Sequence, residues 1–160
     1  MKIPFAKYHA NGNDFILVLD ENFPENLRGA EIISRLCRRN TGIGADGLFI
    51  ISTSDKYDFF LDYYNADGSW ETLCANGSRC AAKFMVDSGN AKRKLKFETG
   101  VGVHAAEIKS DGQVMMSMKI PVYKSDRISP EGIPGFFVDS GARHFVCPSE
   151  QMEDTYVLNI

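Results

Sequence analysis

The stretch Gly77-Ser78-Arg79-Cys80-Ala81-Ala82-Lys83-Phe84-Met85-Val86-Asp87-Ser88 decides the fold. Drawn as a helix, it is apolar in nearly every direction, and its one polar pair is Lys83 and Asp87 at the i,i+4 spacing. A helix that is apolar all round is buried, so other elements have to cover it. Gly89 follows where a left-handed C-cap is expected. We therefore predict a buried central helix over residues 77–88.

Short apolar runs of strand character lie before and after this helix in the chain. Residues typical of turns, mainly Gly, Asn and Asp, separate them. One further amphipathic helix is predicted over residues 29–39, with Arg38 and Arg39 in its last turn. The pattern predicts an α+β fold in which a curved, barrel-like sheet, mixed or antiparallel, wraps round a central helix. The predicted strands cover residues 3–8, 15–19, 48–52, 57–65, 95–99, 101–108 and 114–120.

A change in composition near residue 121 indicates a boundary between domains. Pro and Gly punctuate residues 121–135, and strand character resumes at 136–139 and 144–147. We predict one domain over residues 1–120, and over residues 121–160 a linker followed by the incomplete start of a second domain.

The composition excludes several classes of partner. The chain has 160 residues, a net charge of −3 and scattered Lys and Arg, which predicts no nucleic-acid partner. The sequence contains no run approaching the roughly 20 apolar residues that span a bilayer, which predicts no membrane partner. Four cysteines without a signal peptide are too few for a disulfide framework in a chain of this length. We expect a cytoplasmic protein.

Two motifs that would imply other ligands fail on their context. Gly42, Gly44 and Gly47 spell G-x-G-x-x-G, but they follow a predicted helix and precede a predicted strand, the reverse of the order in dinucleotide-binding folds. Zinc ligands usually come in closely spaced pairs. Cys74 and Cys80 lack that spacing, and the three histidines of the chain are isolated from one another. Neither a dinucleotide nor a metal is predicted. The histidines are His9, His104 and His144.

Cys74 is the residue best placed for chemistry, because it comes just before the predicted central helix. Unpaired N–H groups and the positive end of the dipole lie at a helix start. There a cysteine pKa can fall from about 8.5 to roughly 3.5–7.5, and the same N–H groups can hold a carboxylate. The small side chains of Ala75, Gly77 and Ser78 leave room for a ligand. On these residues alone, an inert, buried core cysteine remains the alternative.

Three separated segments of the sequence share features with one enzyme family. They are Lys7-Tyr8-His9-Ala10-Asn11-Gly12-Asn13-Asp14-Phe15, Gly42-Ile43-Gly44-Ala45-Asp46-Gly47, and Tyr64-Asn65-Ala66-Asp67-Gly68-Ser69 leading into Cys74-Ala75-Asn76-Gly77-Ser78-Arg79-Cys80. A fourth segment, Asp139-Ser140-Gly141-Ala142-Arg143-His144-Phe145-Val146, is a weaker match. Together the segments resemble the diaminopimelate epimerases of the cofactor-independent amino-acid racemase superfamily.

The resemblance implies an isomerase that inverts the α-carbon of LL- and meso-diaminopimelate for lysine and cell-wall synthesis, without pyridoxal phosphate or metal. In that family two cysteines from two pseudo-symmetric domains face the α-carbon from opposite sides, and Cys74 matches the first. By the same resemblance, the side chains of Asn13 and Asn65 and the N–H groups of Ala75 and Asn76 bind substrate. His144 matches a group near the thiols that helps to set their protonation.

The chain departs from the family pattern at a few positions. Ala75 stands where Gly is common, Ala142 and Arg143 replace residues that usually precede the histidine, and Gly47 stands where some relatives carry a polar contact residue. The family's second cysteine lies in a C-terminal half that these residues do not include. Three alternatives therefore stay open: inversion of another amino acid, a truncated domain that binds an amino acid without inverting it, and a homodimer that presents two copies of Cys74.

Overall fold

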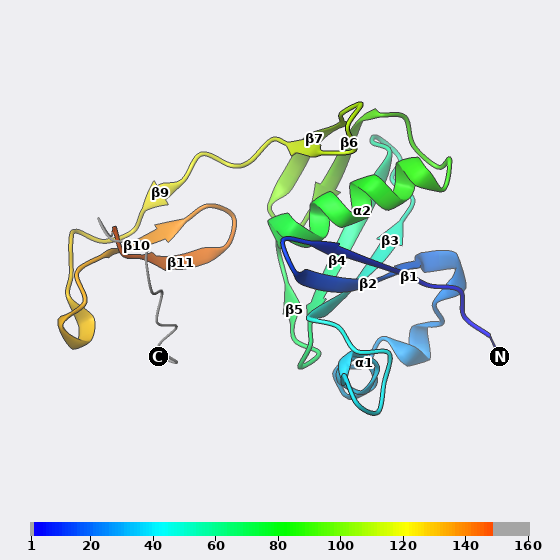
Figure 1. Ribbon diagram of the computed structural model, residues 1–160, viewed down its shortest axis with the longest axis horizontal. Helices are drawn as coiled ribbons and strands as arrows, with labels where there is room; N and C mark the ends of the chain where they lie inside the picture. The colour runs from blue at the N-terminus through cyan, green and yellow to red at the C-terminus, as the bar shows by residue number, and fades with distance from the viewer. Residues whose placement is uncertain (1, 149–160) are drawn as a thin grey trace. The chain divides into compact units, whose positions relative to one another are not determined.

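The computed structural model describes residues 2–148 (Figure 1). The chain separates into two compact units, Met1–Met118 and Lys119–Ile160, each with its own sheet. The last part of the predicted second domain, residues 149–160, lies outside the described residues.

The first unit begins with a hairpin of β1 (Ala6–Ala10) and β2 (Asn13–Leu19). Asn11 and Gly12 connect the strands with positive φ angles of 55° and 85°, the conformation of a tight hairpin turn whose twist matches the strands. The hairpin confirms the predicted pair of strands, but β1 lies later than the predicted 3–8 and β2 begins before the predicted residue 15. It also places Asn13 at the start of β2, directly after the turn.

The sheet of the first unit is mixed and runs in the order β1-β2-β3-β4-β6-β7-β8, with β5 paired to β4. The β2–β3 and β4–β6 pairs are parallel, and β1–β2, β3–β4, β6–β7 and β7–β8 are antiparallel. The predicted strand over 114–120 is shorter than expected, since β8 ends at Met116. The remaining strands are β3 (Gly47–Ser52), β4 (Phe59–Asn65), β5 (Trp70–Glu71), β6 (Lys94–Thr99), β7 (Gly102–Ile108) and β8 (Val114–Met116).

Helix α2 (Ala75–Asp87) is the predicted central helix. It packs against β1 and β2 at one end of the strand order and against β7 and β8 at the other, so the sheet curls round it (Figure 1). Ala81 and Ala82 are fully buried in the core between them, together with Phe15, Phe59 and Phe97. The predicted architecture, a curved sheet round one helix, is confirmed.

Helix α1 (Ala30–Cys37) covers the opposite face of β2 and β3, where Ile16 and Val18 alternate with the core residues Phe15 and Leu17. These strands are buried on both faces, so their apolar residues form continuous runs over 15–19 and 48–51. The predicted position of Arg38 and Arg39 in the last helical turn is wrong, because α1 ends at Cys37. Two short 3-10 helices, Asp20–Asn22 and Glu25–Leu27, connect β2 to α1.

The second unit has a three-stranded antiparallel sheet in the order β11-β10-β9. Its strands are β9 (Val122–Tyr123), β10 (Phe136–Asp139) and β11 (Arg143–Val146), and a 3-10 turn lies at Pro130–Gly132. The segment predicted as a linker, residues 121–135, thus contributes one of the strands.

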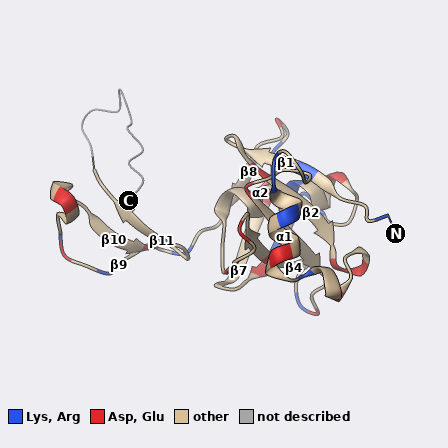
Figure 2. Ribbon diagram, turned by 90° about the horizontal axis from the view of Figure 1, so that it is seen from below, with Lys and Arg blue, Asp and Glu red and all other residues tan. Residues whose placement is uncertain are grey.

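Basic and acidic residues are interspersed along the ribbon of the first unit (Figure 2). In the part of the chain that the structure describes, neither helix has the length and apolarity needed to cross a membrane.

Candidate active site

Cys74 is the residue that immediately precedes α2, with extended backbone angles of φ −129° and ψ 111°. The first bond of the helix runs from the Ser78 N–H to the Cys74 carbonyl, at 2.8 Å. The N–H groups of Ala75, Asn76 and Gly77 therefore precede the helical ladder and are available to a ligand or to the thiol itself. The predicted position of the thiol at a helix start is confirmed.

The predicted low pKa of Cys74 is wrong. Burial of the half-buried side chain raises the pKa of the Cys74 thiol above its ordinary value. The N–H groups of Gly77 and Asn76, the Tyr63 hydroxyl and the Arg79 guanidinium oppose this effect without overcoming it. Near neutral pH Cys74 is therefore a thiol, the form that can give a proton to carbon, and its thiolate has four stabilising groups when it forms.

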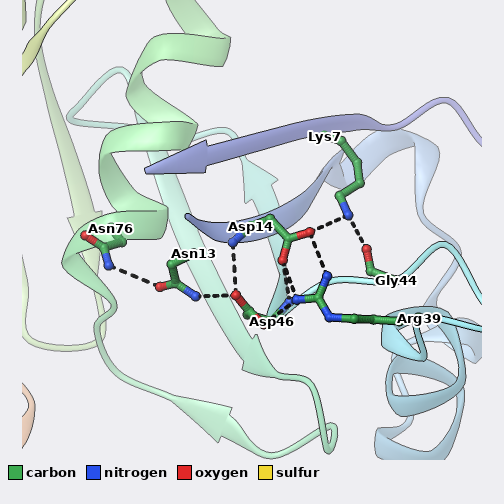
Figure 3. A network of polar contacts seen from close by, with 7 residues as sticks. All are labelled: Lys7, Asn13, Asp14, Arg39, Gly44, Asp46 and Asn76. Atoms are coloured by element: carbon green, nitrogen blue, oxygen red, sulfur yellow. Dashed lines mark hydrogen bonds and ion pairs between the residues drawn. The ribbon is translucent and has the colours of Figure 1, made fainter. Parts of the chain in front are cut away.

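Asn13 and Asn76 are 63 positions apart in the sequence and meet beside this helix start (Figure 3). The Asn76 amide nitrogen donates to Asn13 Oδ1 at 3.1 Å, and the Asn13 amide nitrogen donates to Asp46 Oδ2 at 2.8 Å. Arg79 donates to Asn76 Oδ1 at 2.6 Å. Both ends of the Asn13 amide are thus held, and its second N–H stays free to donate to a ligand.

The hydrogen-bond network continues from Asp46 to Arg39 and from Arg39 to Asp14, away from the helix (Figure 3). Arg39 lies 2.8 Å from Asp14 Oδ1 and 2.6 Å from Asp46 Oδ1, and Lys7 lies 2.6 Å from Asp14 Oδ2. Lys7 also donates to the Gly44 carbonyl. Hydrogen bonds from Arg39 and Lys7 hold the pKa of Asp14 well below its usual range. The loop before β3 is therefore joined to the first hairpin by charged groups that stay ionised at neutral pH.

Asn65 lies at the end of β4 and is held from two sides. The Tyr63 hydroxyl donates to Asn65 Oδ1 at 2.6 Å, and the Asn65 amide nitrogen donates to Ser69 Oγ at 3.1 Å. Ser69 Oγ donates in turn to Asp67 Oδ1 at 2.6 Å. Because Tyr63 also interacts with Cys74, this chain of hydrogen bonds leads to the thiol.

Gly77 lets the core approach the start of α2. A Cβ at this position would lie 2.0 Å from Cε2 of Phe49, whose ring is stacked on Tyr63 at 4.7 Å. Ala75, where the family commonly has Gly, lies within the helix and needs no positive φ, so its methyl group causes no backbone strain.

The structure brings together five of the six predicted site residues through these contacts: Asn13, Asn65, Cys74, Ala75 and Asn76. His144 lies exposed in β11 of the second unit, so its role beside the thiols stays a prediction. Cys37 and Cys80 are buried core residues, as predicted, and burial raises the pKa of each to about 11.

Sequence reasoning missed Tyr63, Asp46, Arg39 and Arg79. Tyr63 could have been found, because residues two apart in a strand share a face and Tyr63 therefore lies on the face of Asn65. No sequence signal indicates the contacts of Arg39. Among residues 2–148, no group of three or more His, Cys, Asp and Glu side chains is arranged to hold a metal ion.

Comparison of the sequence with a family model and with curated proteins finds one family. The family model for diaminopimelate epimerase matches residues 5–123. Diaminopimelate epimerase of Aquifex aeolicus is 34% identical over 98% of this chain and 61% of its own length. That of Azoarcus sp. is 36% identical over 99% of this chain and 55% of its own length. The chain thus spans a little over half the length of these relatives.

Solved structures share the fold at low sequence identity. A probable proline racemase from Agrobacterium radiobacter, with bound carbonate, has a TM-score of 0.71 at 12% identity and covers 89% of this chain and 51% of its own. A hydroxyproline epimerase from Agrobacterium vitis has a TM-score of 0.69 at 12% identity and covers 89% and 50%. The family-model match, the curated relatives and the curled sheet round α2 together show that this chain belongs to the diaminopimelate epimerase family.

Proposed function

We propose that this chain supplies one of the two acid/base groups for stereoinversion at the α-carbon of diaminopimelate, with Cys74 as that group. The observation that carries the proposal is the position of Cys74 at the start of α2, beside N–H groups that precede the hydrogen-bonded turns of the helix. Asn13 and Asn76 support it from one side and Asn65 from the other. The names of the curated relatives supply the substrate.

The chemistry needs two groups that exchange roles. A thiolate on one face takes the α-proton, and the electron pair of the C–H bond moves onto the carboxylate. A thiol on the other face gives its proton to the same carbon, so the two sulfur atoms end with their protonation states exchanged. The N–H groups of Ala75 and Asn76 stabilise the negative charge that develops on the carboxylate.

Cys74 would act as the acid in one direction and as the base in the other. Its raised pKa suits the acid role at neutral pH. We propose that the partner thiol comes either from the C-terminal half that full-length relatives carry or from a second copy of this chain, with His144 near the pair. All four cysteines are free thiols, which supports a location in the cytoplasm.

Exchange of the α-hydrogen of LL- and meso-diaminopimelate with D2O, followed by NMR, tests the proposal. We expect exchange that is lost in Cys74→Ala and kept in Cys147→Ser, which replaces an exposed cysteine. Its rate should rise with pH above neutrality, because proton removal needs the Cys74 thiolate and the thiol has a raised pKa.

A single working thiol gives exchange of the α-hydrogen with little inversion, whereas two working thiols give both exchange and inversion. A rate of inversion that grows with the square of the protein concentration would identify a second copy as the source of the partner thiol. The absence of exchange, or the same exchange in Cys74→Ala, would overturn the role of Cys74. Faster exchange of proline than of diaminopimelate would overturn the substrate.

A further inference from the structure

Tyr63 is a buried polar residue that interacts with both Asn65 and Cys74. Its side chain is 9% exposed and lies in the aromatic core, stacked on Phe49 at 4.7 Å and edge-on to Phe15 at 6.2 Å. A Cβ on Gly47 would lie 2.7 Å from Cε2 of Tyr63 and 3.3 Å from its hydroxyl, so the ring occupies the space above that glycine. The position of the hydroxyl is therefore set by packing on several sides.

The hydroxyl has one proton and two neighbours that can accept it. It donates to Asn65 Oδ1 at 2.6 Å. The Cys74 side chain packs against the core cluster that contains Tyr63, and a hydrogen bond from the hydroxyl favours the Cys74 thiolate. When Cys74 is a thiol, its S–H can donate to the hydroxyl oxygen while the hydroxyl proton points to Asn65. When Cys74 is a thiolate, the proton is needed at the sulfur and Asn65 Oδ1 is released.

We propose that Tyr63 is a positioning residue whose single hydroxyl proton is shared between Asn65 and Cys74, so that contact of an amino-acid ammonium group with Asn65 favours the Cys74 thiolate. The inference rests on the proposed roles of Cys74 and Asn65. An ammonium N–H that donates to Asn65 Oδ1 replaces the Tyr63 proton, which then turns to the sulfur. No atom leaves either residue, since only the direction of one hydrogen bond changes.

The charges round the pair allow this switch. Burial raises the pKa of Tyr63 well above its ordinary value, so the hydroxyl keeps its proton where Cys74 titrates. Asp46 and Glu71 face Tyr63 from the loop before β3 and from β5, and both favour the neutral hydroxyl. From α2, Arg79 favours the Cys74 thiolate, and the neighbouring ionisable group Cys80 is a thiol with a pKa of about 11.

The rate of Cys74 alkylation by iodoacetamide, measured against pH, reports thiolate formation without any substrate. Trypsin separates the cysteines, because it cleaves at Lys56 and Arg79 and leaves Cys74 as the only cysteine in that peptide. Tyr63→Phe removes the donor, and we expect its profile to shift to higher pH by about one unit, since a hydrogen bond to a charged group is worth about tenfold or more in an equilibrium.

Asn65→Leu should shift the alkylation profile in the opposite direction. It removes the competing acceptor, frees the hydroxyl for the sulfur, and should shift the profile to lower pH by roughly half a unit. In Tyr63→Phe/Asn65→Leu this downward shift disappears. Tyr64→Phe is the matched control: it removes the hydroxyl of the neighbouring tyrosine, which packs on the other face of the strand, and should leave the profile unchanged.

Circular dichroism and the fluorescence of Trp70 establish that each variant is folded. An unshifted alkylation profile in folded Tyr63→Phe would overturn the proposal. So would a downward shift from Asn65→Leu that is the same in the wild-type and in the Tyr63→Phe background. These results are independent of turnover. A failure of α-hydrogen exchange with a shifted alkylation profile would count against the proposed function alone.

Discussion

Replacement of Gly77 by Ala tests how the core supports the start of α2. Glycine in a helix costs up to about 1 kcal/mol relative to alanine, so helix propensity alone predicts that Gly77→Ala stabilises the protein. The added Cβ would lie 2.0 Å from Cε2 and 2.2 Å from Cζ of Phe49. Carbon atoms in contact prefer about 3.5–4.0 Å, so the ring would have to move by roughly 1.5 Å.

Phe49 has little room for that movement. It is 1% exposed, stacked on Tyr63 and packed edge-on to Phe15 at 5.4 Å. Overpacking of a dense core typically costs about 1–3 kcal/mol, and an overlap of this size between held groups belongs near the upper end. After the gain in helix propensity, we expect Gly77→Ala to lower the free energy of unfolding by about 1–2 kcal/mol.

Urea unfolding followed by the fluorescence of Trp70, the single tryptophan, measures this change in the first unit. Phe49→Leu supplies the control, because a smaller side chain leaves space for the methyl group. In that background Gly77→Ala should be neutral or stabilising, a coupling of about 1 kcal/mol or more between the two positions. Stabilisation by Gly77→Ala alone, or additive effects of the two changes, would refute the packing argument.

Two further predictions concern the charged network. The pKa of Asp14 is lowered in the folded state, so its contribution to stability is complete above the unfolded value near 3.9 and is lost as pH falls through the folded value. Asp14→Asn should therefore cost about 1–2 kcal/mol in urea unfolding at pH 7 and clearly less at pH 3, whereas equal costs at both would contradict the ion-pair explanation. Asp46→Ala removes the acceptor that holds the Asn13 amide, and should slow α-hydrogen exchange several-fold while Cys74 alkylation keeps its pH profile. A shifted alkylation profile would show that Asp46 acts on the thiol instead.

Periodicity predicted the fold because few arrangements satisfy a helix that is apolar on all sides. The apolar helix over residues 77–88 has to be buried by other elements, and the predicted short strands can pack round it. The ends of elements were less predictable. Arg38 and Arg39 looked like last-turn residues of α1, but the helix stops at Cys37 and Arg39 reaches Asp14 and Asp46 instead. Pairings between residues 25 positions apart depend on the path of a loop, which a local pattern does not contain.

The site was predictable where residue type and position along one element carried it. The sequence pattern predicts that Cys74 lies at a helix start, but it does not predict whether the thiol is protonated. The helix start lowers the pKa of the thiol and burial raises it. The direction of the net pKa shift depends on how deeply the sulfur lies in the core. That depth is set by the core cluster against which Cys74 packs, whose members come from several strands and from α2. A sequence shows that both influences exist without showing which is larger.

Gly47 and Tyr63 illustrate how a departure from a family pattern can be compensated. The family resemblance places Gly47 where a polar contact residue is expected in some relatives, and Gly47 has no side chain to supply that contact. In the folded chain, Gly47 pairs with Asn65 across β3 and β4, and the Tyr63 ring fills the space where a side chain at position 47 would lie. The Tyr63 hydroxyl then presents a polar group to Asn65 and Cys74 from the same place. A Cβ at position 47 would also lie 2.6 Å from the Tyr64 carbonyl oxygen, so a larger residue there would displace both this ring and the neighbouring strand.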